Sequence, residues 1–238
     1  MLSSERLLVC PDTHLPFQHK DMLPFLRKVM EVYTPDMVLH LGDEVDNHKL
    51  SFHDSDEDLP FSASSELAIC IEQMKGLYEV FGGVPVKVCE SNHGSLLYRK
   101  AKHHGIPRDM LRKWEDILEA PDNWEWGFRW VIQTGENKTL FQHSIKANSL
   151  AASKHKSMNT AQGHYHSKCD IQWWSNDTGG LFFGATFGCL VDGDSMGMAY
   201  GKLFVDRPIL GCGVIIDGIP LFIPMILDEE GRWIGQIA

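Results

Sequence analysis

Residues 7–14 read LLVCPDTH, an apolar run that is followed directly by a proline, an aspartate, a threonine and a histidine. An apolar run of this length is typical of a short buried strand. The same arrangement returns at residues 37–43, MVLHLGD, and at residues 84–93, VPVKVCESNH. Residues 23–33 and 67–81, which lie between these runs, carry apolar side chains at helical spacing. Strands that alternate with helices predict β-α-β units and an α/β fold.

The second half of the chain is richer in strand signals. β-branched and aromatic residues predict strands at residues 130–132, 140–142, 171–174 and 181–187, with a short helix at 149–158. Residues 210–227 are long enough to span a membrane, but Asp217-Gly218 lies in their middle and favours a β-hairpin. We therefore expect a single domain over residues 1–238, with two mixed sheets face to face and helices outside. This arrangement is a four-layer α/β/β/α sandwich.

Bulk composition fits a soluble globular enzyme and narrows its partners only a little. The chain has 238 residues, of which 43% are hydrophobic and 23% are charged, so we expect one well-buried domain. Its formal net charge of −10 argues against a general nucleic-acid-binding surface, because phosphate backbones attract basic residues. The charge does not exclude a nuclease, since bound divalent cations would add positive charge locally.

The cysteines and the N-terminal residues indicate a cytoplasmic protein. None of the six cysteines forms a C-x-x-C pair, and most lie in apolar runs, as buried thiols in a reducing compartment do. No signal-peptide pattern precedes the first expected strand. We therefore expect a cytoplasmic location and no membrane partner.

Residues 95–113 form a basic stretch directly after the third apolar run. The stretch holds six lysines and arginines and one acidic residue, for a local charge of +5. The simplest interpretation is an amphipathic helix whose cations face solvent. Because the stretch follows Asn92 and His93, the alternative is that Arg99 and Lys100 contact a substrate phosphate. Both interpretations remain open at this stage.

Polar side chains of a restricted kind follow the expected strands. They occur in five separate segments, as Asp12 and His14, Asp43, Asn92 and His93, His143, and His164 and His166. Ligands of open α/β sheets bind at the carboxyl ends of the strands, so we expect these side chains to meet at one edge. Oxygen and imidazole ligands without thiolates suit Mn, Fe or Zn ions.

The order of these segments resembles the calcineurin-like metallophosphoesterase family. The family pattern is D-x-H, G-D-x-x-D, G-N-H-[DE], a single histidine, and G-H-x-H. The corresponding residues here are Asp12-Thr13-His14, Gly42-Asp43-Glu44-Val45-Asp46, Ser91-Asn92-His93-Gly94, His143 and Gly163-His164-Tyr165-His166. The resemblance spans roughly residues 5–190, and the family outline also fits the closing strands.

The resemblance implies a pair of divalent metal ions, with Mn²⁺ favoured and Fe, Zn or Ni as alternatives. One ion would be held by Asp12, His14, Asp43 and His166, and the other by Asn92, His143, His164 and the same Asp43. Two ions about 3.5–4 Å apart can share a hydroxide that attacks phosphorus, and they can clamp the phosphoryl oxygens. His93 corresponds to the residue that the family uses as a general acid or to stabilise the phosphate.

Two positions depart from the family pattern, and one further position has an open role. Ser91 replaces the glycine of the third motif, and Gly94 replaces the acidic residue after His93. That carboxylate can orient the histidine, and Glu90 is a candidate substitute for it. Asp46, at the end of the second motif, more often supports the loop, but we also consider a direct substrate contact.

The second motif helps to choose among branches of the family. Protein serine/threonine phosphatases usually continue it as G-D-x-x-D-R-G, whereas this chain reads Asp46-Asn47-His48. We therefore expect a phosphodiesterase or nuclease that acts on DNA or nucleotides, similar to compact bacterial and viral members. The basic stretch favours this function over a small-molecule phosphomonoesterase or nucleotidase. A hypothesis from another class is a metal-bound but inactive scaffold that serves an ATPase in DNA repair.

Overall fold

The computed structural model describes residues 2–52, 62–194 and 207–237. Its larger sheet has six strands in the order β11-β10-β1-β2-β3-β4. Their bounds are β1 Arg6–Cys10, β2 Met37–His40, β3 Val86–Cys89, β4 Trp124–Gly127, β10 Gly211–Ile216 and β11 Ile219–Pro224. Strands β1 to β4 run parallel, whereas β10 and β11 pair antiparallel. The carboxyl ends of four neighbouring strands therefore lie along one edge of the sheet.

The smaller sheet has five strands in the order β5-β6-β7-β9-β8. Their bounds are β5 Trp130–Thr134, β6 Asn137–Phe141, β7 Asn159–Gln162, β8 Cys169–Ser175 and β9 Leu181–Phe187. The three central strands are parallel, and β5 and β8 pair antiparallel at the two edges. Both sheets are therefore mixed.

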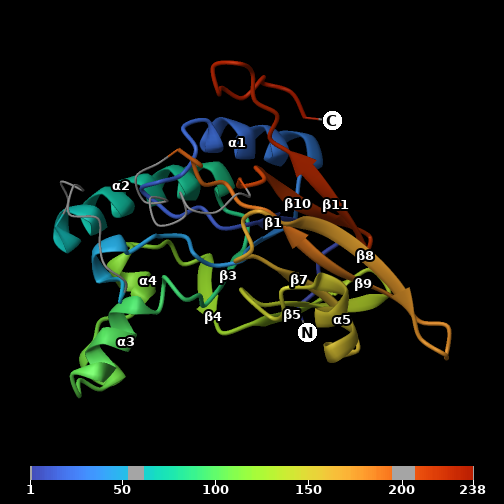
Figure 1. The fold of residues 1–238 in the computed structure, drawn as a ribbon, viewed down its shortest axis with the longest axis horizontal. Coiled ribbons are helices and arrows are strands. Elements are labelled where there is room, and N and C mark those ends of the chain that lie inside the picture. The colour runs from blue at the N-terminus through green and yellow to red at the C-terminus, as the bar shows by residue number, and fades with distance from the viewer. Residues whose placement is uncertain (1, 53–61, 195–206, 238) are drawn as a thin grey trace.

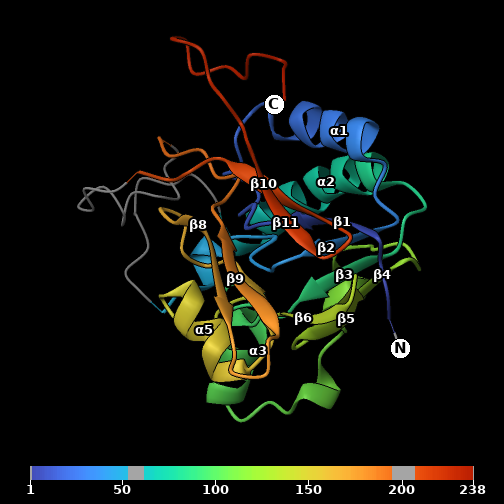
Figure 2. The same cartoon turned by 90° about the vertical axis from the view of Figure 1, so that its right-hand side faces the viewer.

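The two sheets pack face to face, and helices cover both outer faces (Figure 1 and Figure 2). Successive side chains of a strand point to opposite faces, so Leu7 packs with Phe141 and Phe183 between the sheets while Leu8 packs with Phe25 under the helices. The covering helices are α1 (Met22–Tyr33) and α2 (Ala63–Phe81) on the larger sheet and α5 (Ser149–Lys156) on the smaller. The predicted four-layer α/β/β/α sandwich is confirmed.

Local sequence explains where the helices begin and end. Helix α2 starts after Ser62, whose hydroxyl accepts the Ser65 N–H while the Ser65 hydroxyl accepts the Ser62 N–H, a capping box. The helix ends at Gly82, which has φ 55°. The basic stretch forms helix α3 (Leu96–His103) and a single 3-10 turn (Arg108–Met110), and the short α4 (Trp114–Ile117) follows it. The amphipathic-helix interpretation therefore holds for only part of the stretch.

Strand β7 is a difference from the sequence analysis, which predicts a helix at residues 149–158 and no strand between it and Gly163. The structure places β7 between α5 and this glycine. The sequence of β7, NTAQ, has no apolar run, yet all four residues are buried. Their polar groups are satisfied inside: Asn159 Oδ1 accepts the Phe183 N–H, and Gln162 Oε1 accepts the N–H groups of Ile145 and Lys146. A buried polar strand of this kind carries no hydrophobic signal.

The hairpin of β10 and β11 turns at Asp217-Gly218, as predicted. Residues 210–227 are therefore used as two strands of the larger sheet. Across the described ranges, the helices are all too short or too polar to traverse a bilayer.

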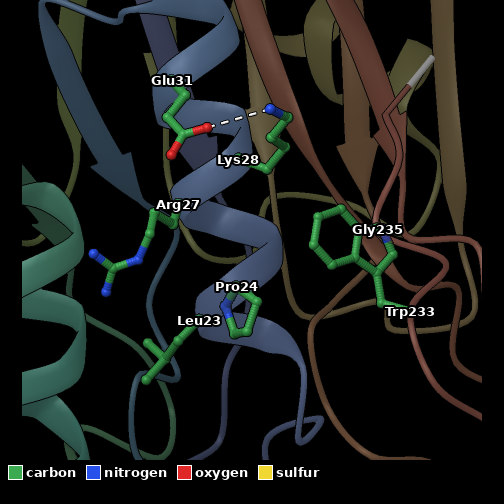
Figure 3. Close-up of a pocket in the computed structure, with 7 residues that line it drawn as sticks. All are labelled: Leu23, Pro24, Arg27, Lys28, Glu31, Trp233 and Gly235. Carbon is green, nitrogen blue, oxygen red and sulfur yellow. Dashed lines mark hydrogen bonds and ion pairs between the residues drawn. The ribbon is translucent and has the colours of Figure 1, made fainter.

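After β11 the chain returns across α1. The Arg232 guanidinium donates two hydrogen bonds to the Asp21 carboxylate, at 2.6 and 2.8 Å. A hollow of about 330 Å³ lies between α1 and this tail (Figure 3), with Trp233 on one wall and the ion pair of Lys28 and Glu31 on the other. None of the predicted metal ligands lines this hollow.

Candidate metal centre

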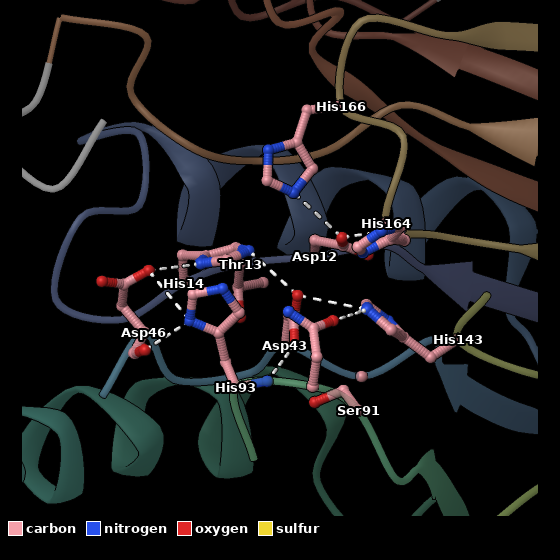
Figure 4. A network of polar contacts seen from close by, with 12 residues as sticks. Asp12, Thr13, His14, Asp43, Asp46, Ser91, His93, His143, His164 and His166 are labelled. Carbon is pink, nitrogen blue, oxygen red and sulfur yellow. Dashed lines mark hydrogen bonds and ion pairs between the residues drawn. The ribbon is translucent and has the colours of Figure 1, made fainter. Parts of the chain in front are cut away.

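The loops after β1 and β2 bring three predicted ligands together. Because β1 and β2 are parallel neighbours, Asp12 and His14 leave the sheet beside Asp43. The Asp43 carbonyl accepts the N–H groups of Thr13, at 3.1 Å, and His14, at 2.8 Å. These two bonds fix one loop to the other, and the three side chains lie around a common space (Figure 4).

Three further segments end at the same place. Strand β3 leads to Asn92 and His93, β6 leads to His143, and β7 leads to His164 and His166. Residues from five parts of the chain thus meet in one network of polar contacts (Figure 4), and Asn92 joins it through His143. Their roles as ligands remain predictions.

Two groups of potential ligand atoms share Asp43. In the first group, atoms of Asp12, His14, Asp43 and His166 all lie within 4.8 Å of one another. In the second group, atoms of Asp43, His143 and His164 do the same. Asn92 adjoins the second group, because its Oδ1 atom is 2.6 Å from Nε2 of His143. The arrangement offers two adjoining metal sites with one common carboxylate.

Two of these atoms are buried without an ordinary hydrogen-bond partner, as expected of metal ligands. Within residues 2–52, 62–194 and 207–237, Asp12 Oδ1 has no partner, and His14 Nε2 meets only the Asp43 carboxylate, at 3.3 Å. His143 Nδ1 lies 2.9 Å from the Leu41 carbonyl, so Nδ1 carries a hydrogen and a neutral ring keeps its lone pair on Nε2. That lone pair faces the Asn92 oxygen, which is also an acceptor. Acceptors that converge on one another fit a bound divalent cation.

The carboxylates and histidines shift each other's pKa values in the metal-free protein. Burial opposes protonation of His143, but the charges of Asp43 and Asp12 outweigh burial and raise its pKa to about 9. Burial likewise opposes ionisation of Asp43, yet the charge of His143 and the hydrogen bonds from His14 and His143 hold its pKa well below the usual range. A metal ion would have to displace protons from these histidines.

Three of the predicted ligands have left-handed backbone conformations. The φ angle is 46° at His14, 50° at Asp43 and 68° at His164. Such angles are uncommon outside glycine and cost on the order of 1–3 kcal/mol each. Gly42, at φ 96°, leaves no space for a side chain, since an added Cβ would lie 2.7 Å from the Cys89 carbonyl oxygen. Four of the eight non-glycine residues with positive φ among the described residues, these three and Asn47, lie in the loops that carry the candidate ligands, and such strain is common at functional sites.

Comparison with known protein families agrees with this geometry. The family model described as calcineurin-like phosphoesterase matches residues 5–192. This chain belongs to the calcineurin-like phosphoesterase family. The family resemblance seen in the sequence is thereby confirmed, and with it the expectation that divalent metals bind to proteins of this family. No curated protein sequence matches the chain.

Solved structures that share the fold of this calcineurin-like phosphoesterase include Vps29 proteins. Vacuolar Protein Sorting 29 from Cryptosporidium parvum has a TM-score of 0.53 and 13% identity, with 99% of this chain and 96% of that chain covered. Chaetomium thermophilum Vps29, solved with a RaPID-derived cyclic peptide, has a TM-score of 0.50 and 12% identity, with 99% and 94% covered. At such identities the likeness shows a common fold alone.

Glu44 fills the space of the acidic residue that this calcineurin-like phosphoesterase lacks after His93. A Cβ added at Gly94 would lie 3.4 Å from Glu44 Oε1. The same oxygen accepts hydrogen bonds from the indole N–H groups of Trp114, at 2.6 Å, and Trp126, at 3.1 Å. Burial raises the pKa of the Glu44 carboxyl group. The sequence analysis missed this residue, whose only signal is its place next to Asp43.

The remaining expectations about the third family motif have different outcomes. Ser91 is compatible with the turn, because its buried hydroxyl accepts the Gly94 N–H at 3.1 Å. The prediction that Glu90 supplies the missing carboxylate is wrong. Glu90 turns to the surface, where its Oε1 atom lies 3.2 Å from the Arg108 guanidinium. The carboxylate in that space comes from the loop after β2 instead.

Asp46 is placed to support a predicted ligand. Its Oδ1 atom lies 2.6 Å from Nδ1 of His14, and the residue is only 1% exposed. A carboxylate on the second nitrogen of a metal-binding histidine fixes the ring and raises its basicity. Because Asp46 is almost completely buried, we no longer expect it to contact the substrate, and we infer that it orients His14 instead.

Arg99 and Lys100 lie on α3, outside the two groups of ligand atoms. The guanidinium carbon of Arg99 and Nζ of Lys100 lie 5.3 and 5.4 Å from the ring centroid of Phe52. Phe52 follows the short 3-10 helix His48–Leu50 and has no sequence signal of its own. Contact between these two cations and a substrate remains a prediction.

Proposed function

We propose that this calcineurin-like phosphoesterase is a phosphodiesterase or nuclease that uses two divalent metal ions to hydrolyse phosphoesters of DNA or nucleotides. The observation that carries the proposal is the position of Asp43, which belongs to both groups of ligand atoms. A carboxylate between two cation sites offsets the repulsion between the cations, and such pairs of sites serve phosphoryl transfer in many enzymes.

The donor atoms of the chain divide between two sites. One ion would be held by Asp12, His14, His166 and Asp43, and the other by Asn92, His143, His164 and Asp43. When bound, such a pair of ions supplies positive charge to the phosphoryl oxygens and lowers the pKa of a water. The oxygen and imidazole donors suit Mn²⁺, with Fe, Zn and Ni as alternatives.

We propose that His93 transfers a proton. Its Nδ1 lies at hydrogen-bond distance from the Asp46 carbonyl, which can only accept, so Nδ1 carries a hydrogen. The other ring nitrogen, Nε2, is then the atom that acts on the leaving oxygen of the substrate. Nε2 donates a proton when the ring is doubly protonated and takes one back from water afterwards. The ring centroids of His93 and His14 are 4.6 Å apart, so the proton transfer would take place next to the first group of ligand atoms.

The charge beside the centre supports a diester substrate. Helix α3 starts three residues after His93 and carries Arg99, Lys100 and Lys102. A polynucleotide has further phosphates that could meet these cations. A phosphomonoester has only the phosphate that the two metal sites would already bind.

The first experiment compares bis-p-nitrophenyl phosphate with p-nitrophenyl phosphate in the presence of Mn²⁺. We expect faster turnover of the diester. Faster turnover of the monoester would replace the proposal with a phosphomonoesterase or nucleotidase. If the protein holds two metal ions by mass spectrometry and turns over neither compound, an inactive scaffold is the better interpretation.

Two variants separate metal binding from proton transfer. Asp43→Asn should lose metal and activity together, because the shared negative charge is removed. His93→Asn should keep both metals and lose about 10²- to 10⁴-fold in turnover, the usual contribution of a general acid. Full turnover by His93→Asn would eliminate its role in proton transfer.

A further inference from the structure

A hollow of about 450 Å³, lined in part by an aromatic ring, lies along helix α3. Its lining residues are Phe52, Arg99, Lys102 and His103. The Phe52 side chain is large and apolar, yet the residue is 52% exposed. The Arg99 and Lys100 cations that lie over the ring, together with the edge of His103 at 6.5 Å between centroids, hold it at the surface.

Two segments that leave the metal centre form this hollow. One runs from Asp46 to Phe52, and the other runs from His93 into α3 and reaches Arg99. The side-chain amide of Asn47 donates to the His93 carbonyl at 3.0 Å and ties the two segments together where they begin. The first three residue steps of α3 advance about 4.5 Å along the helix axis. Arg99 therefore lies about one helical turn beyond the start of α3, and Lys102 and His103 lie about one turn further along the same helix.

The hollow is positively charged. In the described part of the chain, no carboxylate lies within 4.0 Å of the charged groups of Arg99, Lys100 or Lys102. Arg108, further along, differs from them because it is paired with Glu90. The acidic residues at 54–58 follow Phe52 in the sequence and lie outside the described residues. Cations without carboxylate partners are available to a phosphate.

We propose that this hollow binds an unpaired nucleobase next to the phosphate that is hydrolysed, so that the substrate is a single-stranded polynucleotide. Phe52 stacks on the base, and Arg99 and Lys102 contact the adjoining phosphate. A positively charged groove with an exposed aromatic ring is how proteins bind single strands without reading their sequence. A docking patch for another protein would add further apolar side chains around the ring, whereas the lining here is cationic. The inference rests on the proposed phosphodiesterase function and specifies its substrate.

The first test compares two p-nitrophenyl esters that differ only in the base. One is the ester of thymidine 5′-phosphate, and the other carries an abasic deoxyribose in place of thymidine. Phe52→Ala should lower kcat/KM for the thymidine ester about 5- to 150-fold, the range for one stacked base, and leave the abasic ester unchanged. Phe52→Trp should retain the preference for thymidine. An equal effect on both esters, or no effect, would overturn the role of Phe52.

The second test measures binding in EDTA and so does not depend on turnover. Fluorescence anisotropy compares labelled oligothymidylate with an abasic oligonucleotide of the same length. Phe52→Ala should weaken only the oligothymidylate complex, whereas Lys102→Gln should weaken both and reduce the salt slope by about 0.7, the value for one phosphate contact on a single strand. Ile219→Ala is the matched control, because Ile219 is 56% exposed in the hairpin next to the amino end of β1, away from the centre.

The two tests distinguish failure of the subsite from failure of the proposed function. If the wild-type protein hydrolyses neither ester but Phe52 still discriminates between the oligonucleotides, the hydrolytic function fails and the base subsite stands. If both esters are hydrolysed and Phe52→Ala changes neither preference, the subsite fails and the function stands. If Phe52→Ala lowers kcat/KM for the thymidine ester but does not weaken binding of oligothymidylate, the substrate is a mononucleotide ester and not a single strand.

Discussion

Gly163→Ala is expected to damage the metal centre without removing a single predicted ligand. Gly163 precedes His164, and its backbone passes directly beside Asp12. A Cβ at this position would lie 2.1 Å from Asp12 Oδ1 and 3.2 Å from the Leu41 Cβ. Ordinary contacts of a Cβ begin near 3.4 Å, so the carboxylate would have to move by about 1.3 Å. The φ angle of Gly163 lies outside the left-handed region, so the effect is steric and not conformational.

A movement of this size is large for a ligand. A displacement of about 1 Å costs on the order of 10²-fold in rate when groups must be held in a reactive geometry. We expect kcat/KM for bis-p-nitrophenyl phosphate to fall about 100-fold, and the affinity of the first metal site to fall about 10- to 100-fold. The overpacked methyl group should also reduce the free energy of unfolding by about 1–3 kcal/mol.

The assay combines metal content by mass spectrometry, metal affinity by calorimetry and steady-state kinetics on one preparation. Gly83→Ala is the matched control, because a Cβ at Gly83 meets nothing within 4 Å. This control should bind metal and turn over substrate as the wild type does. If Gly163→Ala binds two metal ions with wild-type affinity, then Asp12 does not contribute to the site in the way the structure places it.

Four further predictions rest on the polar contacts. Asp46→Asn should weaken metal binding about 10- to 100-fold in calorimetry, because the carboxylate that orients His14 is lost, and unchanged affinity would contradict that role. Metal affinity should increase from pH 6 to 9, since His143, with a pKa of about 9 in the metal-free protein, must lose its proton to bind; calorimetry in buffers of different ionisation enthalpy should detect the released proton. The stability of the metal-free protein should instead fall as pH rises. The raised pKa of His143 stabilises the fold fully below about pH 6.5, the pKa of histidine in the unfolded chain, and this stabilisation is lost as pH rises through about 9. A Tm that falls over this range would report the loss. Asp21→Asn should reduce the free energy of unfolding in urea by about 1–3 kcal/mol, because the hydrogen bonds from Arg232 hold the pKa of Asp21 below its usual range. In the wild type this stabilisation is present above about pH 4 and should be lost on acidification. Equal unfolding midpoints of the variant and the wild type at pH 7 would argue against it.

Much of the candidate metal centre was predictable, because each short motif directly follows a strand. Asp12 comes two residues after β1 and Asp43 three residues after β2, and parallel neighbours end at the same edge of a sheet. The strand positions could be predicted from apolar runs, which are a local property of the chain. Where a strand had no such run, as in β7, the prediction failed, because the buried polar groups of Asn159 and Gln162 are satisfied by distant partners.

The site residues that the sequence analysis missed all depend on long-range packing. Glu44 takes the space beside Gly94 because two indole groups, 70 and 82 residues further along the chain, hold its carboxylate there. Phe52 faces the cations of α3 only because the loop after β2 and the loop after β3 are tied together at Asn47. Neither contact has a signature in the residues that flank it.

The sequence by itself determined the α/β class, the element order and the set of Asp, Asn and His residues that end the strands. Side-chain periodicity and strand-end motifs are carried by neighbours in the chain, so they can be read without a structure. Only the tertiary structure decided that Asp43 is common to both ligand groups, that Asp46 faces His14 and that Phe52 lies in a cationic hollow. These relations join segments tens of residues apart, and the packing of the sheets and loops sets their distances.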